Sequence, residues 1–446
     1  MNETNIFQKK LLDNCNKFVQ KLKKKNIDIA LNPECFFTIW AKTPGQITIK
    51  NILGKKKSFS DYFFIFKNII SVAKNHDLEI ISNHEIKSLN KIKIIISYSS
   101  KENFDKRGIF HDQYFNISSK EKNIIWFLIS LDNFTPKKIN KNLLIVRKKK
   151  DNSASLIYLL KYFFILICQN ITTLSKIKNH LWFENNFALQ IQRLFNTSFK
   201  NKNITRVLFN YESTPWQNNL INYIKKKNRS IKTIGYLHCA PWPIQTDLMY
   251  RNIKLDQLYV SGEDQKLNLV NYLGWNKKKI KVIPSLRFLK SKEKIFRGYI
   301  FPPYNLEKKN TFLERFENYI SRLPNKSLNY MKIRIHPLNK KSETHLKFKK
   351  NIEAVVKRYK KKFTKKGNFS IFFGSATGVC VQALEEGTKI IHFPNCNLLD
   401  VFSESFWRSI KTKKIYSNIY EYELKKYKRM FLTNFETNKF KKYLLF

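Results

Sequence analysis

Short apolar runs alternate with amphipathic stretches along most of this chain. The runs are rich in Ile, Val, Phe and Trp, which is typical of buried β-strands. Where such strands alternate with helices, the pattern predicts a parallel, doubly wound α/β sheet. In the first part of the chain the expected strands are Leu78–Ile81, Ile92–Ser97, Asn123–Ile129, Asn142–Val146, Arg206–Asn210, Ile231–Leu237, Gln257–Val260 and Lys279–Ile283.

The pattern restarts after residue 290 and predicts a second α/β domain. The charged stretch Lys290–Arg297 reads as a linker, so we predict domains over residues 1–290, with a helical insertion near 151–199, and 291–446. The tail Phe402–Phe446 is aromatic and basic, and we expect it to be mostly helical and to pack back onto the first domain. The expected elements before it are the strands Gly298–Phe301, Lys332–His336, Ser370–Phe373 and Lys389–Phe393 and the helix Leu306–Arg322.

The charge of the chain is strongly positive. Eighty-four basic residues against 33 acidic ones give a formal net charge of +51. The excess is mostly lysine and accompanies abundant Asn, Ile, Phe and Tyr, so we attribute part of it to AT-rich codons. The remainder favours contact with anionic lipid or nucleic acid. Candidate membrane contacts are the N-terminal lysines, the helix around Lys347–Lys366 and the tail Lys425–Lys442.

Several features favour a cytoplasmic protein. Met1–Lys25 is polar and lacks the apolar core of a signal peptide. The most apolar run, Leu156–Cys168, has 13 residues and includes Lys161, whereas a membrane span needs roughly 20. We expect a buried helix there, with a membrane-surface or partner contact as the alternative. The cysteines form no CxxC pair and are expected to be reduced; they are Cys15, Cys35, Cys168, Cys239, Cys380 and Cys396.

Polar residues follow successive expected strands of the first domain. Glu212, His238 and Ser261 each come directly after a strand. Because the carboxyl ends of parallel strands share one edge, where α/β sheets bind ligands, these residues are site candidates. The loop Ser99–Ser119 adds His111, Asp112 and Tyr114 after another strand. The alternatives are that Glu212 caps the helix that begins near Trp216 and that the loop only packs its aromatic residues.

The second domain offers a candidate phosphate site. His336-Pro337 ends one strand, and the turn Gly374-Ser375-Ala376-Thr377-Gly378 links another strand to a helix. Backbone N–H groups at a helix N-terminus, with the two hydroxyls of this turn, favour a phosphate or carboxylate. Glu385 and Glu386 near the end of that helix are candidate ribose contacts, with a solvated helix face as the alternative. His336 itself could instead be a structural histidine.

Some kinds of chemistry are disfavoured by what the sequence lacks. No P-loop and no GxGxxG motif occurs, which argues against an ATPase or an NAD-dependent enzyme. No DxD follows a strand, and the histidines are scattered. We therefore expect a site that needs neither a metal ion nor another cofactor.

These residues carry a resemblance to the GT-B glycosyltransferases, which have two Rossmann-like domains facing each other across a cleft. Three further pieces resemble a bacterial family of surface carbohydrate (capsule or lipopolysaccharide) biosynthesis. They are Gly108-x-Phe-His-Asp-x-Tyr-Phe115, Tyr211-Glu212-x-x-Pro-Trp216 followed by Ile234-Gly-Tyr-x-His238, and Ser285-Leu-Arg287. The resemblance implies cleft positions, on the acceptor side, for His111, Asp112, His238 and Arg287.

The His-Pro and Ser/Thr arrangement is similar to that of sialyl-, polysialyl- and Kdo-transferases. The resemblance implies that His336 and Pro337 hold the phosphate of a CMP-linked donor. It implies that Ser375 and Thr377 hold the phosphate or the sugar carboxylate, beside Gly374, Glu385 and Glu386 on the donor side. It makes Glu212 the base. This chain lacks the Asp/Glu-Asp/Glu-Gly triplet of sialyltransferases at Glu212.

We therefore expect a glycosyltransferase that transfers a sugar from a nucleotide-sugar donor to a glycan or lipid-linked glycan. It would act in the cytoplasm, peripheral to the inner face of the membrane. The alternatives of the same architecture are a glycerol- or ribitol-phosphate transferase and a nucleotide-sugar epimerase. A non-catalytic nucleic-acid-binding protein is the alternative of another class. Against it, the basic residues are dispersed and the sequence contains no recognisable nucleic-acid-binding module.

Overall fold

A computed structural model gives the fold of the chain. It describes residues 3–24, 28–30, 32–38, 44–54, 78–82, 91–121, 123–149, 181–239, 241–288, 298–304, 306, 309–336, 339–365, 370–374, 378–394, 397–416 and 418–426. The apolar run Leu156–Cys168, the linker Lys290–Arg297 and the site candidates Pro337, Ser375 and Thr377 lie outside the described residues.

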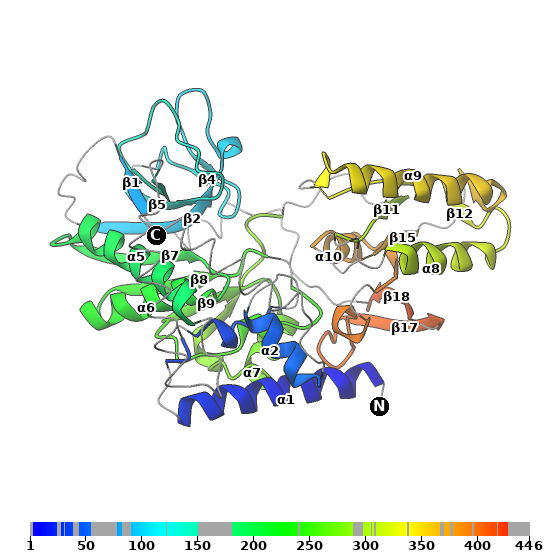
Figure 1. Ribbon diagram of the computed structural model, residues 1–446, viewed down its shortest axis with the longest axis horizontal. Coiled ribbons are helices and arrows are strands. Elements are labelled where there is room, and N and C mark those ends of the chain that lie inside the picture. Colours follow the sequence, from blue (N-terminus) through cyan, green and yellow to red (C-terminus); the bar gives the residue numbers. More distant parts are fainter. Residues whose placement is uncertain are drawn as a thin grey trace, which may run out of the picture.

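The first half of the chain forms an eight-stranded sheet that is parallel except at one edge (Figure 1). Only β1 pairs in the antiparallel sense, with β6, so the expectation of a parallel α/β sheet is confirmed. The strand order is β1 (Leu78–Ile81), β6 (Leu143–Lys148), β5 (Ile124–Ser130), β2 (Ile92–Ser99), β7 (Ile204–Asn210), β8 (Lys232–Tyr236), β9 (Gln257–Val260) and β10 (Ile280–Val282).

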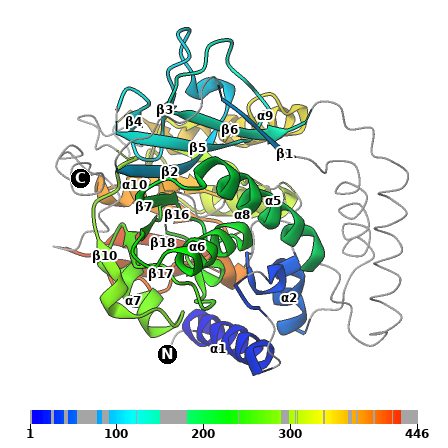
Figure 2. The ribbon, with the colours of Figure 1, turned by 90° about the vertical axis from the view of Figure 1, so that its left-hand side faces the viewer.

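Successive side chains of the central strands point to two separate apolar clusters, as the two-residue period of a strand requires. Phe127 belongs to one cluster, and its neighbours Trp126 and Leu128 belong to the other. Helices α5 (Leu181–Phe199), α6 (Pro215–Lys227) and α7 (Glu263–Asn271) are among the helices that contribute to the first cluster (Figure 2). The second face is covered differently, by aromatic residues of the loop between β2 and β5.

The strict alternation of strand and helix expected for this half is not found in the described residues between β2 and β6. Residues 131–142, between β5 and β6, contain no helix. The loop between β2 and β5 holds the short antiparallel pair β3 (His111–Asp112) and β4 (Ile117–Ser118). The Asn142 side chain donates hydrogen bonds to the carbonyl oxygens of Ser119 (2.9 Å) and Ile124 (3.0 Å), and these bonds tie the loop to the sheet.

The second half forms a six-stranded mixed sheet. Its order is β13 (Lys332–Ile333), β11 (Tyr299–Phe301), β15 (Ser370–Phe373), β16 (Lys389–His392), β18 (Ile419–Leu424) and β17 (Ile410–Tyr416). The first four strands are parallel. Its helices are α8 (Lys309–Ser321), α9 (Glu343–Arg358) and α10 (Gly378–Glu385), and a separate short pair joins β12 (Leu328–Asn329) to β14 (Phe363–Thr364).

The expected helical tail is wrong for residues 410–424, which form the antiparallel hairpin β17–β18. The segment is rich in β-branched and aromatic residues, and its alternating burial fits a strand better than a helix. Asn418 has a positive φ of 59°, the left-handed conformation that tight turns use and that asparagine tolerates. Residues 427–446 lie outside the described part of the chain.

Helix α1 (Glu3–Lys24) contacts both halves and runs along the bottom of Figure 1, followed by α2 (Pro44–Ile52). The Gln8 amide donates to the carbonyl oxygens of Leu398 (2.7 Å) and Val401 (2.8 Å) in the second half. Asn16 donates to the Tyr272 carbonyl in the first half. Among the described residues, no helix combines the length and apolar character that a membrane span requires.

The two halves also meet directly, through residues just before β17 in the second half and residues that follow β8 and β9 in the first half. Trp407 Nε1, in the segment after β16, donates to the carbonyl oxygen of Pro243, after β8, at 2.8 Å. The Ser409 N–H donates to the Asp264 carboxylate, after β9, at 2.7 Å. The start of the tail therefore does pack onto the first half, at the carboxyl edge of the first sheet. In the second sheet Ser409 lies at the amino edge, because Ile410 pairs with Leu424, which is level with the start of β16.

Candidate active site

A compact polar cluster lies at the carboxyl edge of the first sheet. Glu212 follows β7, and His238 and Cys239 follow the neighbouring parallel strand β8. Glu212 Oε1 lies 3.3 Å from His238 Nε2, which lies 3.0 Å from Cys239 Sγ. Glu212 Oε2 accepts a hydrogen bond of 3.1 Å from the Tyr98 hydroxyl, near the end of β2. Three adjacent strands thus bring together residues far apart in the sequence, and the expected convergence of Glu212 and His238 is found.

The Glu212 carboxylate does not cap helix α6. Gln217 organises that helix start instead: its side-chain oxygen accepts from the backbone N–H of Glu212 at 2.8 Å, and its amide donates to the Asn210 carbonyl. The Glu212 carboxylate contacts Tyr98 and the residues after β8, none of which is a backbone N–H of α6. The helix-cap explanation is therefore wrong.

The turn that presents Glu212 is strained and held by a buried arginine. Ser213 has a φ of 58°, a left-handed conformation that costs a non-glycine residue about 1 kcal/mol or more. Arg251 is fully buried, and its Nη2 donates to the carbonyl oxygen of Ser213 and to its Oγ, the latter at 2.9 Å. Its guanidinium also lies over the Phe36 ring. The surroundings therefore fix the backbone beside Glu212.

Burial shifts the proton affinities of this cluster in opposite directions. Burial raises the pKa of Glu212, and the Tyr98 hydrogen bond and the positive charge of Arg287 partly oppose that rise. Burial, with a smaller contribution from Arg287, holds the pKa of His238 well below its usual range. His238 is therefore neutral near pH 7, and among the described residues its Nδ1 has no hydrogen-bond partner. A carboxyl whose pKa is raised towards neutrality is suited to exchange a proton with a bound substrate.

Tyr114 packs against His238, and Asp112 holds the backbone of Tyr114. The Tyr114 ring packs edge-on against the His238 ring with centroids 4.3 Å apart. Asp112 accepts hydrogen bonds from the Ser97 hydroxyl and from the backbone N–H groups of Tyr114 and Phe115. Burial raises the pKa of Asp112 to about 6 in spite of these hydrogen bonds, which lower it.

The structure separates His111 from its neighbour Asp112. The His111 side chain is 57% exposed, and its Nε2 lies 3.8 Å from the Asp105 carboxylate. Successive residues of the strand β3 point to opposite sides, so the Asp112 side chain is buried whereas that of His111 is exposed. His111 does not join the cluster with Asp112, contrary to the expectation of a shared cleft position.

Sequence reasoning missed Tyr98, Asp247 and Arg251. Tyr98 could have been found, because it lies near the end of a predicted strand like the other candidates. Asp247 lies in the irregular segment after β8; burial raises its pKa to about 7, and the nearby Glu212 adds to that rise. No local pattern marks Asp247 or Arg251, since only the folded loop brings them towards Glu212.

Glu212, His238 and Cys239 also form a possible metal-ligand set. Each offers one donor atom, and the three atoms lie within 4.8 Å of one another. Carboxylate, imidazole and thiolate are ligand types that Zn²⁺ accepts. Burial raises the pKa of the Cys239 thiol, so the thiol is protonated near pH 7 unless a cation displaces its proton. Metal independence stays a prediction.

The second sheet carries His336 and Gly374 at its own carboxyl edge. His336 follows β13 and Gly374 follows β15, the two neighbours of β11. The Tyr304 ring, just beyond β11, packs edge-on against His336 with centroids 5.1 Å apart. A Cβ on Gly374 would lie 2.4 Å from Pro303 Cδ, so only glycine lets the chain after β15 pass this close to Pro303. Burial and the neighbouring His345 lower the pKa of His336.

Glu385 and Glu386 are not brought to that edge. Helix α10 begins at Gly378, beside the carboxyl end of β15, and runs to Glu385. A helix of eight residues spans about 12 Å, and the chain then enters β16 from its amino end. Both glutamates therefore lie towards the opposite edge of the sheet from His336, because a crossover helix runs antiparallel to its strands. A shared donor site with His336 is not supported for them.

Comparisons with known proteins leave the site to be interpreted from its own geometry. No protein-family model matches this chain, and no curated protein gives a significant match. Among solved structures, the N-terminal domain of Candida albicans trehalose-6-phosphate phosphatase matches 70% of this chain and 84% of that chain, with 10% sequence identity and a TM-score of 0.36. A match at this TM-score and identity carries no argument about function.

Proposed function

We propose that this chain is a glycosyltransferase of surface polysaccharide biosynthesis, of the GT-B type, in which Glu212 is the general base. The observation that carries the proposal is the Glu212 carboxylate itself. It lies at the carboxyl edge of a parallel sheet, contacts Tyr98 and His238, has a raised pKa and does not cap its helix. The side chain is 35% exposed, which leaves it accessible to a substrate.

The chemistry requires a base of this kind. The acceptor hydroxyl oxygen attacks the anomeric carbon of the donor sugar while the bond from that carbon to the nucleotide phosphate breaks. The bonding electron pair leaves on the phosphate oxygen, and the hydroxyl proton passes to Glu212. General-base assistance of this kind contributes about 10²–10⁴-fold to the rate. The neutral imidazole of His238, next to the carboxylate, adds no positive charge that would weaken it as a base.

The donor is proposed to bind at the edge of the second sheet. His336 and Gly374 both follow strands there, and His336 is the group assigned to the leaving phosphate. The Trp407–Pro243 and Ser409–Asp264 hydrogen bonds join the second half to the carboxyl edge of the first sheet. The proposal places the donor and the acceptor between the two halves, with a nucleotide sugar as the donor and CMP as the first nucleotide to test.

A donor panel tests the proposal directly. The full chain is incubated with CMP-sugars, UDP-sugars and CDP-glycerol, and binding is followed by thermal shift and turnover by nucleotide release. We expect a nucleotide sugar to raise the melting temperature and His336→Ala to weaken its binding and turnover together. His111→Ala is the matched control, because that exposed histidine lies outside the cluster.

Unchanged nucleotide affinity in His336→Ala would place the donor site elsewhere. A response to CDP-glycerol alone would favour the glycerol-phosphate transferase, and the absence of any nucleotide response would remove the enzyme proposal.

Reversible association with an anionic membrane surface completes the proposal. Helix α9 buries Phe348, Ile352 and Val355 and leaves lysines such as Lys347 and Lys350 exposed. Each lysine near an anionic bilayer contributes about 1 kcal/mol. Co-sedimentation with anionic liposomes should therefore fall steeply as salt is added, and equal binding to neutral vesicles would contradict the idea.

A further inference from the structure

Arg287 stands beside the Glu212 cluster on a rigid support. Its guanidinium carbon lies 5.2 Å from the Tyr114 ring centroid and 5.3 Å from that of Phe288. Tyr114 in turn packs against the His238 ring at 4.3 Å. The Tyr114 ring therefore contacts both the cation and the His238 imidazole, and the positive charge of Arg287 acts on both Glu212 and His238.

The backbone of Arg287 is held by two buried hydroxyl groups. The Ser285 Oγ accepts from the N–H of Arg287 at 3.2 Å, and the Tyr236 hydroxyl accepts from the N–H of Leu286 at 2.7 Å. Ser285 and Tyr236 are both fully buried. The position of the arginine is therefore set by the fold before any ligand binds, which lowers the entropic cost of binding.

The guanidinium of Arg287 has no counter-ion of its own. Among the described residues it makes no ion pair and no side-chain hydrogen bond, and its side chain is exposed. Arginine offers five N–H donors in a planar fork that matches a carboxylate or a phosphate. Aromatic rings beneath the guanidinium satisfy its flat face and leave its N–H edge for such a group.

We propose that Arg287 is an oxyanion-binding residue, and that the sugar bound beside Glu212 carries a carboxylate or a phosphate group. The proposal rests on the proposed function only in calling that ligand a sugar. The rival explanation is that Arg287 merely offsets the negative charge of Glu212 and Asp112. The two explanations differ in whether an added anion competes for the guanidinium.

Equilibrium binding to the full chain decides between them. The probes are inorganic phosphate, glucose 6-phosphate and glucuronate, with glucose as the neutral reference, each titrated by calorimetry at low salt. Arg287→Gln should weaken at least one anionic probe by about 10–100-fold, the value of a charge-assisted hydrogen-bonded pair, and leave glucose unchanged. A preference for glucuronate identifies a sugar acid, and a preference for glucose 6-phosphate identifies a phosphorylated sugar.

Arg322→Gln is the matched control. Arg322 is also exposed and also lies over a tyrosine ring, that of Tyr416 at 4.8 Å, in the second half of the chain. It should leave the binding of every probe unchanged. Arg287→Lys should retain part of the binding, because it keeps the charge and loses the fork.

Equal binding of all anionic probes by the wild type and Arg287→Gln, or no binding by either, would overturn the proposal in favour of charge compensation. These titrations need no turnover. Loss of anion binding in Arg287→Gln alongside full turnover in Glu212→Gln would keep the oxyanion site and remove the glycosyltransferase mechanism.

Discussion

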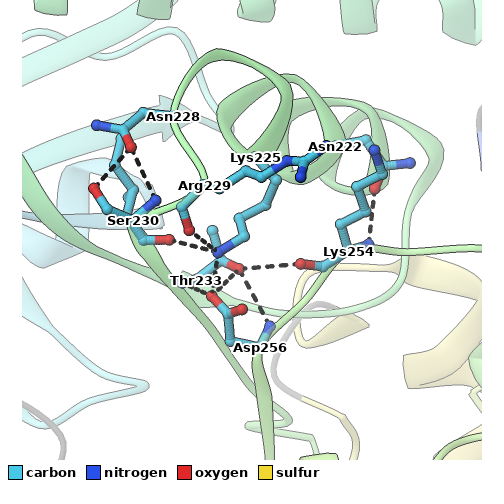
Figure 3. Close-up of polar contacts among 9 residues, drawn as sticks. Asn222, Lys225, Asn228, Arg229, Ser230, Thr233, Lys254 and Asp256 are labelled. Atoms are coloured by element: carbon cyan, nitrogen blue, oxygen red, sulfur yellow. Dashed lines mark hydrogen bonds and ion pairs between the residues drawn. The ribbon is translucent and has the colours of Figure 1, made fainter.

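The two edges of the first sheet both carry charged residues, but they use them differently. At the amino edge, Lys225 Nζ donates to the carbonyl oxygens of Arg229 and Ile231 and to Asp256 Oδ2, all at 2.8–2.9 Å (Figure 3). The same Asp256 oxygen accepts from the backbone N–H and the hydroxyl of Thr233. Every donor of the ammonium group is used, so the network ties the end of α6 to the starts of β8 and β9.

At the carboxyl edge the contacts are longer and the network is left open. Glu212 Oε1 lies 3.3 Å from His238 Nε2 and 4.0 Å from Cys239 Sγ. Among the described residues the His238 Nδ1 has no partner and the Arg287 guanidinium has no counter-ion. At the amino edge the polar groups bond to one another and stabilise the fold. At the carboxyl edge, proton-transfer groups and a cation stay available to a ligand. The same carboxylate-to-amide change should therefore have opposite consequences at the two edges.

The largest expected effect is on Glu212. Glu212→Gln keeps the shape of the side chain and removes its basicity, so turnover with the donor identified by the panel should fall about 10²–10⁴-fold. Donor affinity should barely change. The melting temperature should not fall, since burial already disfavours the ionised carboxylate.

Nucleotide release, donor titration and thermal unfolding on this one variant provide the check. Near-normal turnover would contradict the base assignment, and Asp112 and His238 would become the next candidates.

Asp112 should control how stability depends on pH. Its pKa in the folded protein is raised from 3.8 to about 6, so the unfolded chain loses this proton first as the pH rises. Stability should therefore fall between about pH 4 and pH 6 and stay lower above that. The shift corresponds to about 3 kcal/mol, and Asp112→Asn should remove that loss. Urea unfolding at pH 4, 5, 6 and 7 measures the free energy of unfolding of both proteins. If this free energy changes with pH equally in Asp112→Asn and in the wild type, Asp112 does not control the pH dependence.

Asp256→Asn is the counterpart of Glu212→Gln at the amino edge. It leaves the Lys225 ammonium, whose side chain is 12% exposed, without its anionic partner. We expect a loss of about 1–3 kcal/mol in the free energy of unfolding, with turnover unchanged because the residue is remote from the carboxyl edge. Denaturant unfolding tests the loss of stability, and nucleotide release tests the unchanged turnover. A loss of turnover without a loss of stability would show that the amino edge does not serve the fold alone.

Tyr98→Phe should produce the smallest effect, visible in the pH profile. The Tyr98 hydrogen bond lowers the pKa of Glu212, so its removal should raise that pKa and move the acid limb of kcat/KM to higher pH. Above that limb the rate should approach the wild-type rate. Tyr223→Phe removes a hydroxyl bonded to Asn196 on the helical face and should leave the profile in place. An identical shift in both variants would exclude a specific role for Tyr98.

Much of the candidate site follows from the order of residues alone. Glu212 and His238 come directly after apolar runs, and parallel strands must present their carboxyl ends at one edge. The site prediction failed for residues that do not directly follow a strand of the parallel sheet. His111 and Asp112 point to opposite sides of a two-residue strand, and Glu385 and Glu386 lie at the far end of a helix. Asp247 and Arg251 come from an irregular segment that has no period to read.

The sequence by itself determined the strands of the first sheet, because their runs of β-branched and aromatic residues can be satisfied only by burial on both faces. It also determined which residues sit at strand ends. Only the tertiary structure decided that the segment 410–424 is a hairpin, since its pairing partner β16 lies in another part of the chain. Tertiary packing likewise decided the proton affinities of Glu212 and His238, because desolvation depends on what surrounds a group in space and not on its neighbours in sequence.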